Sequence, residues 1–403
     1  MGQTELIDSV LTAASPGETE QLLMDLIAIE SHSDIQDQEE QIACFIRDWL
    51  SERGIECMLT EVLPGRPNVI ARLTGDGTGP SLVLNGHLDT VPPYGMHSPF
   101  KALNKEGKWY GRGSVDMKGA LAAMLSALAA IKRSGICLRG DVYFAGTIGE
   151  ESYSPGAYQL SRSGFTADYA IVGEPTGLRT GIAHKGVAWY EAEFAGRSVH
   201  GSVPEQGINA IYRASRWIEH IQDRYLPSLK ERSHPLLGSP SLNIGTIEGG
   251  TRTVTVPNRC RIGFERRLIP GETAESALME FQATLVAVKE EHPDFQGEIR
   301  IADNFHGVPH GPLQTPPDSP LAAALSSAYE DEFKEEGVSR SDALIGLQFW
   351  TDAALLQECC RHTVVCGPGN IEQAHSDDEY IEERQLHAAT RIYIRTAAAL
   401  CAR

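Results

Sequence analysis

Short apolar runs and helix-type repeats alternate along much of the chain. Four runs are rich in β-branched residues and have the length of buried strands: 81–86, 141–147, 168–173 and 362–367. Between the first two runs, apolar residues from Met117 to Ile131 recur at helical spacing, and Gly135 is placed to end that helix. Because strands alternate with helices, we expect an α/β domain with a mostly parallel sheet.

Further helical patterns lie near both ends of the chain. Apolar periodicity between residues 20 and 53 predicts two helices separated by the polar segment 31–40, and Gly54 is placed to end the second helix. The segment 380–398 is an amphipathic tail. Together with the strand at 362–367, this tail indicates that the first domain resumes near the C-terminus.

The pattern changes after residue 182. Strand-type and helix-type segments then follow in the order strand, helix, strand, strand, helix, strand: 187–196, 208–221, 241–250, 259–268, 274–291 and 297–303. This order is typical of the split ferredoxin-like arrangement. We therefore expect a discontinuous α/β domain formed by 1–182 and 304–403, which carries an inserted α+β domain over 183–303. The Pro- and Gly-rich segment 306–320 is the expected re-entry loop.

Charge and composition narrow the classes of partner. The chain has 403 residues, with 35 Lys and Arg against 54 Asp and Glu, which gives a formal net charge of −19. Such a chain offers no generic basic surface, so we expect neither nucleic acid nor an anionic membrane as a partner. The longest near-apolar stretch, 120–131, is about 12 residues long against the ~20 needed to cross a bilayer, and it predicts a buried helix.

Cysteine usage and the N-terminal residues bear on the compartment. The eight cysteines include no CxxC pair, so neither a zinc ribbon nor a disulfide framework is indicated. The first ten residues have no basic and apolar regions of a secretory signal. We therefore expect a cytoplasmic protein with reduced thiols.

Polar side chains that could carry chemistry follow each apolar run. In open α/β sheets, ligands bind beyond the carboxyl ends of the strands. The candidate residues at these positions are His87 and Asp89, Glu150 and Glu151, Glu174, and His375, with Asp116 before the long helix. Two imidazoles with several carboxylates form the mixed nitrogen and oxygen ligand set that suits zinc or cobalt. The sequence therefore predicts a metal site at this edge of the sheet.

Two local spacings suggest roles around such a metal. Asp89 lies two residues after His87, so in an extended segment its carboxylate could reach the second imidazole nitrogen. The neighbours Glu150 and Glu151 must point in different directions, so one can bind metal while the other faces the substrate as a base. The chain has no GxSxG, HExxH or Walker motif, which disfavours a serine hydrolase, a zincin and an NTPase.

These residues and their surroundings resemble the M20 family of metallopeptidases and deacylases, which includes acetylornithine deacetylase, succinyl-diaminopimelate desuccinylase, aminoacylase and carboxypeptidase G. The motifs that carry the resemblance occur in the family's order: GHLDTVP (86–92), YGRGSVDMKGALAAML (110–125), GEES (149–152), VGEPTG (172–177), GRSVHGSVPEQGINAI (196–211), ERRLIPGET (265–273) and AHSDDEY (374–380). They span nearly the whole chain.

The resemblance implies a centre with two divalent metal ions, zinc by default and cobalt as an alternative. Asp116 would bridge them, with His87 and Glu174 on one ion and Glu151 and His375 on the other. Glu150 would be the general base acting on a water between the metals, and Asp89 would support this catalytic group. The family pattern also implies a cis peptide bond between Asp116 and Met117.

The inserted domain would serve as a lid and dimerisation domain. By resemblance, His200 reaches the active site of the second chain of a homodimer and stabilises the oxyanion, and Arg267 holds a substrate carboxylate. Asn370, before His375, is a further candidate for substrate binding. Many relatives carry an asparagine in an NVxP stretch where this chain has Val254. Because His200 lies on the insert, we expect hinge closure near residues 182 and 304.

The resemblance therefore implies an enzyme that hydrolyses the amide bond of a small N-acyl amino acid. The tail GPGNIEQAHSDDEY is most similar to that of acetylornithine deacetylases and desuccinylases. Peptides, as substrates of a dipeptidase or carboxypeptidase, and a specialised amide or carbamate are the alternatives within the family. A one-metal hydrolase and a catalytically silent ligand-binding relative are alternatives of other kinds.

Overall fold

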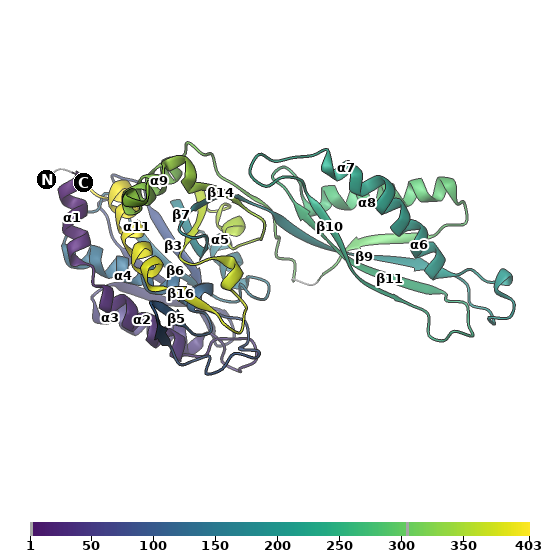
Figure 1. The fold of residues 1–403 in the computed structure, drawn as a ribbon, viewed down its shortest axis with the longest axis horizontal. Helices are drawn as coiled ribbons and strands as arrows, with labels where there is room; N and C mark the ends of the chain where they lie inside the picture. Colours follow the sequence, from purple (N-terminus) through teal and green to yellow (C-terminus); the bar gives the residue numbers. More distant parts are fainter. Residues whose placement is uncertain (1–2, 304–305) are drawn as a thin grey trace. The chain divides into compact units, whose positions relative to one another are not determined.

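The computed structural model describes residues 3–303 and 306–403, which divide into two compact units (Figure 1). Unit 1 comprises Met1–Ile182, Gln314–Gly346 and Thr351–Arg403, and unit 2 comprises Ala183–Leu313 and Leu347–Trp350. The first segment of the inserted unit ends at Leu313, ten residues later than the predicted boundary at residue 303. Residues following 303 stay with unit 2 because the Val187 N–H donates a hydrogen bond to the His310 carbonyl oxygen over 2.9 Å.

A single sheet forms the centre of unit 1, in the order β1-β2-β6-β3-β7-β15-β8-β13, with β14 paired to β8. Its strands are β1 (Glu56–Leu63), β2 (Arg66–Leu73), β3 (Leu82–His87), β6 (Val142–Thr147), β7 (Ala167–Pro175), β8 (Thr180–His184), β13 (Leu313–Gln314), β14 (Leu344–Leu347) and β15 (Cys360–Gly367). The strands β6, β3, β7 and β15 are mutually parallel. Strand β2 pairs antiparallel with β6, and β1 pairs antiparallel with β2. The four predicted strands are these four parallel ones, and the α/β prediction is confirmed.

Helices pack around this sheet. They are α1 (Gln3–Ala13), α2 (Pro16–Ala28), α3 (Glu40–Glu52), α4 (Gly119–Ser134), α5 (Pro155–Arg162), α9 (Pro320–Glu332), α10 (Ala353–Leu356) and α11 (Glu383–Cys401). The two helices predicted before Gly54 are α2 and α3, and α4 ends at Gly135 as expected. Helix α4 contacts the strands β3, β6 and β7 on one side and α1, α2 and α11 on another.

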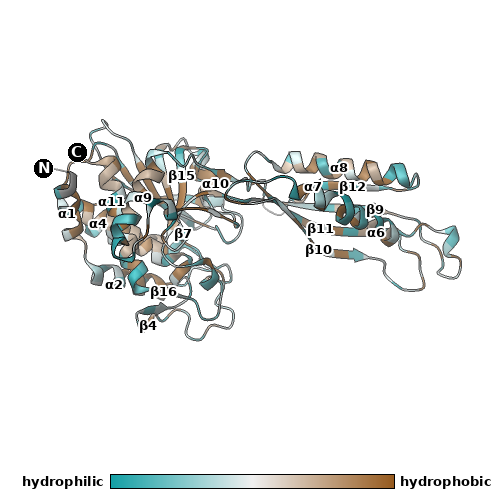
Figure 2. Ribbon diagram, turned by 45° about the horizontal axis from the view of Figure 1, so that its top comes forward, coloured by the Kyte–Doolittle hydropathy of each residue, from teal (hydrophilic) through white to brown (hydrophobic). Residues whose placement is uncertain are grey.

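Helix α4 is the apolar centre of unit 1. Within the described residues, one helical segment, Ser114–Ser134, is long and apolar enough to cross a membrane. Its apolar part is buried inside the protein, while Lys132 and Arg133 near its end are exposed. Leu121, Met124 and Leu128 have no exposed surface. The segment is therefore a core helix, as the sequence predicts for 120–131. Figure 2 shows further hydrophobic residues along β15 and α10.

A second, small sheet joins distant segments of unit 1. It has the order β16-β5-β4, with β4 (Leu103–Lys105), β5 (Lys108–Tyr110) and β16 (Tyr380–Glu382). Tyr380 pairs with Tyr110, so the segment that follows His375 lies against the segment that precedes Asp116. The C-terminal helix consequently begins at Glu383, three residues later than the amphipathic tail suggests.

Unit 2 contains the elements predicted for the inserted domain. Its strands and helices are β9 (Gly186–Ala195), α6 (Ala210–His220), α7 (Leu226–Lys230), β10 (Ser241–Gly249), β11 (Arg259–Leu268), α8 (Ala274–Glu291) and β12 (Gly297–Ile301). The antiparallel order β10-β11-β9-β12 is that of a split ferredoxin-like sheet. Its core is aromatic: the rings of Trp217 and Phe264 lie 5.3 Å apart, and those of Phe264 and Phe281 lie 4.9 Å apart.

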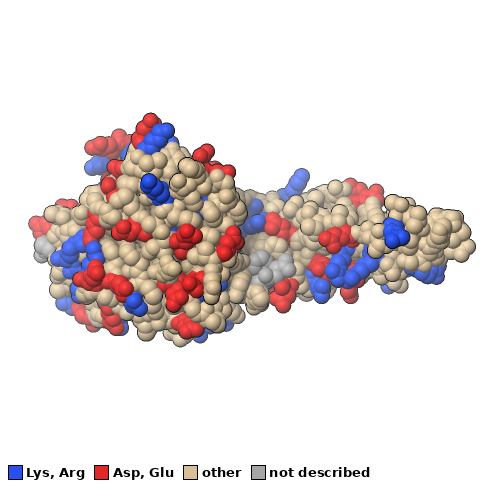
Figure 3. Space-filling view, turned by 90° about the horizontal axis from the view of Figure 1, so that it is seen from below, with Lys and Arg blue, Asp and Glu red and all other residues tan. Residues whose placement is uncertain are grey.

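Charged side chains are spread over the surface. Figure 3 shows acidic side chains dispersed over the visible face of unit 1, with Lys and Arg side chains among them. Many of these charges pair across strands or helices, as Arg259 and Arg261 do with Glu193 on the sheet of unit 2. The acidic excess is therefore not concentrated into one patch on that face.

Candidate metal centre

The parallel strands of unit 1 bring the candidate ligands to one edge of the sheet. His87 is the last residue of β3, and Glu174 lies near the end of the neighbouring strand β7. Glu150 and Glu151 follow β6, and His375 follows β15. The parallel pairing places the carboxyl ends of these strands side by side, which is why residues so far apart in sequence meet.

Two groups of ligands share Asp116. In the first group, His87 Nε2 lies 2.9 Å from Asp116 Oδ1 and 3.6 Å from Glu174 Oε1. In the second, His375 Nε2 lies 3.3 Å from Asp116 Oδ2 and 3.0 Å from Glu151 Oε1. Within each group the ligand atoms all lie within 4.8 Å of one another. Asp116 thus turns one carboxylate oxygen toward each group.

The chemistry of this donor set fits two divalent metal ions. Glu174 Oε1 is buried and has no hydrogen-bond partner among the described groups, although a buried carboxylate normally requires one. His87, Asp116 and Glu174 are at least nine-tenths buried, whereas the side chain of His375 is half exposed. One group is therefore enclosed and the other is open toward solvent.

In the absence of metal, the pKa values of three candidate ligands are raised, so that these side chains bind protons more tightly. Hydrogen bonds to Asp116 and Glu151 raise the pKa of His375 to about 10. Burial lowers the pKa of His87, but hydrogen bonds to Asp116 and Asp89 outweigh it and raise the net value well above the usual range. Burial, and then the charge of Asp116, raise the pKa of Glu174. The raised histidine pKa values reflect the surrounding carboxylates, and the raised pKa of Glu174 reflects burial first and the neighbouring negative charge second.

Glu150 stands beside the ligands without belonging to either group. Burial, and then the negative charge of Glu174, raise its pKa well above the ordinary value. The Glu150 and Glu151 N–H groups donate to the two carboxylate oxygens of Asp89, over 3.1 and 3.0 Å. A carboxyl group with a raised pKa next to a metal centre can accept and return a proton near neutral pH.

Asp89 contacts His87 differently from the expectation. The nearest acceptor of His87 Nδ1 is the Asp89 main-chain oxygen at 2.8 Å, and the carboxylate oxygen lies at 3.5 Å. The carboxylate is instead occupied by the turn that carries Glu150 and Glu151. Asp89 therefore orients His87 through its backbone and the glutamate pair through its side chain.

Glu379 was not identified from the sequence, although it orders the turn that carries Asp116. Its carboxylate accepts hydrogen bonds from Arg112 Nη1 at 2.5 Å and from the N–H groups of Gly113, Val115 and Asp116 at 3.0, 3.0 and 3.2 Å. Both Arg112 and Glu379 are fully buried. The available signal was that Glu379 belongs to the same AHSDDEY motif as His375.

Asp352 is a second buried carboxyl group that the sequence did not reveal. Its Oδ2 accepts a hydrogen bond from Thr147 Oγ1 over 3.1 Å, and Thr147 pairs with His87 across the sheet. Burial raises the pKa of Asp352 to about 6. It precedes the short helix α10 rather than following an apolar run, so the strand-end rule gave no reason to select it.

Glycines make room for the backbone beneath the centre. A Cβ on Gly86 would lie 2.6 Å from Met117 Cε, and a Cβ on Gly367 would lie 1.9 Å from the Gly173 carbonyl oxygen. The chain therefore needs glycine where β15 approaches β7, whereas at Gly86 a Cβ would require the Met117 and Leu121 side chains to shift. The peptide bond between Asp116 and Met117 is cis, as the family pattern implied.

The remaining candidates divide between the two units. His200 and Val254 are exposed on unit 2, where the Gly201 N–H donates to the Val254 carbonyl oxygen over 2.7 Å. Arg267 is one-third exposed and pairs with Glu265 at 3.1 Å. Asn370 is exposed on unit 1 and forms a β-bridge with Thr176, two residues beyond Glu174.

Arg266 and Arg267 differ in their surroundings. Arg266 has no exposed surface and pairs with Glu272 at 2.9 Å. It also donates to the carbonyl oxygen of Arg267, so its guanidinium is used inside unit 2. Of the two arginines, Arg267 is the one with solvent access.

A mostly parallel α/β sheet that gathers two groups of histidine and carboxylate ligands around a shared aspartate defines a metal-dependent hydrolase. Comparison with known families agrees with that class: the model of peptidase family M20/M25/M40 matches residues 83–399. The chain belongs to this family, and it is a metal-dependent amidohydrolase that uses divalent metal ions.

Named relatives and solved structures support the assignment. The acetylornithine deacetylase of Proteus mirabilis is 33% identical over 355 residues, which is 85% of each chain. That of Salmonella typhimurium is 31% identical over 389 residues, covering 93% of this chain and 96% of the relative. The aminopeptidase PepT of Bacillus cereus aligns with a TM-score of 0.77 at 20% identity, over 96% of this chain and 99% of that one.

A further solved structure has a similar fold. The YXEP protein of Bacillus subtilis, described as a dinuclear metal-binding peptidase of the M20 family, aligns with a TM-score of 0.70 at 18% identity. The alignment covers 95% of this chain and 97% of that one. At such identities the likeness concerns the fold.

Proposed function

We propose that the enzyme hydrolyses the amide bond of a small N-acyl amino acid of the acetylornithine or succinyl-diaminopimelate type. The observation that carries the proposal is the placement of Glu150 beside two ligand groups that share Asp116. The relatives named acetylornithine deacetylase, which are about one-third identical over most of the chain, support the substrate class. The products would be a carboxylate and a free amine.

Five side chains would hold two metal ions, with zinc as the first candidate and cobalt as the second. His87 and Glu174 would bind one ion, Glu151 and His375 the other, and Asp116 both. When bound, such ions polarise a carbonyl group and make a coordinated water more acidic. Mixed imidazole and carboxylate ligands suit both metals.

Glu150 would move the proton in the reaction. Its carboxylate would accept a proton from the attacking water and hold it while the tetrahedral carbon forms. The same oxygen would then give that proton to the amine nitrogen as the carbon–nitrogen bond breaks. The raised pKa of Glu150 and the hydrogen bonds of its turn to Asp89 support this role, because they let the side chain hold a proton in a fixed orientation.

Residues of unit 2 would complete substrate recognition. We propose that His200 donates to the oxyanion from the second chain of a homodimer and that Arg267 binds the substrate carboxylate. We further propose that unit 2 acts as a lid with hinges near residues 182 and 304, the second of which lies outside the described residues. Asn370 on unit 1 would contact the substrate beside Glu174. The exposure of His200 and the solvent access of Arg267 are compatible with these roles. We place the enzyme in the cytoplasm.

The first test is amine release from a panel of amides. The metal-loaded enzyme is supplied with N-acetyl, N-succinyl and N-carbamoyl amino acids and with dipeptides, including N-acetylornithine and succinyl-diaminopimelate. We expect turnover of one acyl class and loss of that turnover with a chelator. Turnover of dipeptides alone would assign a peptidase instead. No turnover of any member would contradict the proposal and favour a carbamate substrate or a silent relative.

A further inference from the structure

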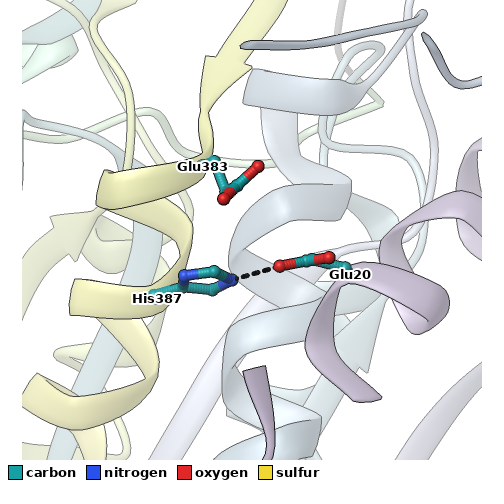
Figure 4. Close-up of side chains that lie close together, drawn as sticks. All are labelled: Glu20, Glu383 and His387. Atoms are coloured by element: carbon teal, nitrogen blue, oxygen red, sulfur yellow. Dashed lines mark ion pairs between the residues drawn. The ribbon is translucent and has the colours of Figure 1, made fainter. Parts of the chain in front are cut away.

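A third group of potential metal ligands lies between the helices α2 and α11 of unit 1. Glu20 comes from α2, and Glu383 and His387 come from α11 (Figure 4). His387 Nε2 lies 2.9 Å from Glu20 Oε1, and one ligand atom from each of the three residues lies within 4.8 Å of the others. Figure 4 shows the three side chains turned toward the same space between the helices.

The spacing along α11 explains why two of the ligands meet. Glu383 and His387 are four residues apart, so they lie on the same face of the helix one turn from each other. Glu20 reaches them because α2 packs against α11. The group thus joins the N-terminal part of the chain to its last helix, and it exists only in the folded protein.

No lysine or arginine of the described residues forms an ion pair that balances the negative charge of this group. Among the ion pairs of the described residues, Glu20 pairs with His387 and with no lysine or arginine, and Glu383 pairs with no basic residue. With a neutral imidazole the group therefore carries two negative charges. A divalent cation would neutralise both charges, as it does in metal sites that contain two carboxylates.

The surroundings of the group also match a metal site. His387 Nε2 is buried and makes no hydrogen bond of good geometry, although it lies within ion-pair distance of Glu20. Asn104 Nδ2 donates to Glu383 Oε2 over 2.7 Å, which orients the carboxylate and leaves Oε1 to bind. Outer hydrogen bonds of this kind commonly orient metal-ligating carboxylates.

We propose that Glu20, Glu383 and His387 bind a third divalent transition-metal ion of the zinc class. One imidazole nitrogen and two carboxylate oxygens supply three positions, and water completes the coordination. The ion links α2 to α11 and stabilises the folded chain, because the unfolded chain does not bring these residues together. The site is independent of the proposed function, since none of its ligands belongs to the two groups around Asp116.

Zinc stoichiometry tests the site. The metal-free full-length protein is titrated with Zn²⁺ against a chromophoric chelator, and the equivalents bound per chain are compared between wild type and His387→Ala. We expect the variant to bind one equivalent fewer while amide hydrolysis is unchanged. His220→Ala is the matched control, because His220 also lies on a helix but outside the three ligand groups, and it should bind as many equivalents as wild type.

A second variant, Glu20→Gln, tests whether a loss of zinc in His387→Ala comes from the site itself or from misfolding. Glu20→Gln keeps the size of the side chain and should also lose one equivalent, together with part of the increase in melting temperature that Zn²⁺ produces in wild type. Equal zinc stoichiometry in wild type, His387→Ala and Glu20→Gln would overturn the proposal and leave the group as an ion pair. An equal loss in the His220→Ala control would overturn it as well.

Discussion

Glu150 and Glu151 are adjacent, yet the structure gives them different surroundings. Only Glu151 reaches His375, at 3.0 Å, while Glu150 belongs to neither ligand group. We predict that Glu150→Gln lowers kcat by about 10²–10⁴-fold, the usual contribution of a general base, with unchanged metal content. The measurement is amide hydrolysis together with metal analysis of the purified protein.

The neighbouring residue supplies the control for this prediction. Glu151→Gln removes a proposed metal ligand and should lower the metal content as well as the activity. Full hydrolysis by Glu150→Gln would show that another group acts as the base.

Glu379 acts on the metal centre through the backbone that it binds. Its carboxylate accepts three N–H groups of the turn that ends in Asp116. In Glu379→Gln, an NH2 group replaces one carboxylate oxygen and cannot accept a hydrogen bond from these N–H groups. The variant should therefore bind metal about 10–100-fold more weakly, as changes to outer residues of metal sites do. Metal titration of the variant beside Glu382→Gln, a nearby carboxylate on β16, separates this effect from loss of surface charge. Equal affinities would contradict the role of Glu379.

The raised histidine pKa values predict that metal and protons compete. With a pKa of about 10, His375 is protonated at pH 7 in the metal-free protein, but a metal ligand must be the neutral imidazole. Metal binding should therefore release at least one proton, and the apparent affinity should rise with pH by about tenfold per unit for each proton released. Calorimetry in buffers of different ionisation enthalpy measures the release. Heats that are independent of the buffer would contradict it.

At the scale of elements, Gly367 in β15 controls how closely two parallel strands approach. A Cβ there would lie 1.9 Å from the Gly173 carbonyl oxygen and 2.5 Å from that of Glu174. Gly367→Ala should therefore cost about 1–3 kcal/mol or more of unfolding free energy and displace Glu174. Urea denaturation and metal content are the measurements.

Gly17 in α2 is the control position for the Gly367→Ala prediction. A Cβ at Gly17 meets nothing within 4 Å, so Gly17→Ala should be neutral or stabilising by up to about 1 kcal/mol. Similar stability of wild type and Gly367→Ala would show that the strands can separate at no cost.

Elements with a strong periodic pattern were predictable, and those with mixed patterns were not. The parallel strands are buried on both faces, so β3 and β7 appear as continuous apolar runs. Strand β1 is largely half-buried or exposed, with polar residues among apolar ones, and it was missed together with β2. All six elements of unit 2 that the sequence predicted are present. Strand β11 alternates buried with less buried residues along its length, whereas β10 has only half-buried residues, Leu242 and Ile244, among exposed ones.

At the scale of the whole molecule, the proposed role of His200 requires a second chain, and mixed dimers test it. Chains with His200→Ala are combined with chains that carry Glu150→Gln. If His200 acts across the dimer, each hybrid contains one intact site, and an equal mixture should regain about a quarter of wild-type activity. Each parent alone should remain inactive. No recovery in hybrids that have been shown to form would contradict action between chains.

The sequence by itself determined the class of the enzyme and predicted most of the candidate ligands that the structure brings together. Strand-type runs followed by histidine or carboxylate residues predict a ligand site, because parallel strands end at a common edge. His87, Glu174 and His375 follow from that rule, and the motif order indicates the family. These inferences depend only on local pattern, which the chain carries residue by residue.

Only the tertiary structure showed which distant groups hold these ligands in place. Glu379 and Asp352 are buried carboxyl groups whose partners are main-chain N–H groups and a threonine hydroxyl from other segments. Two further contacts also join remote parts of the chain. The Asp89 carboxylate accepts a hydrogen bond from the turn that carries Glu150 and Glu151, and Glu20 pairs with His387. No local pattern encodes such contacts, because they arise when packing brings separate elements within hydrogen-bonding distance.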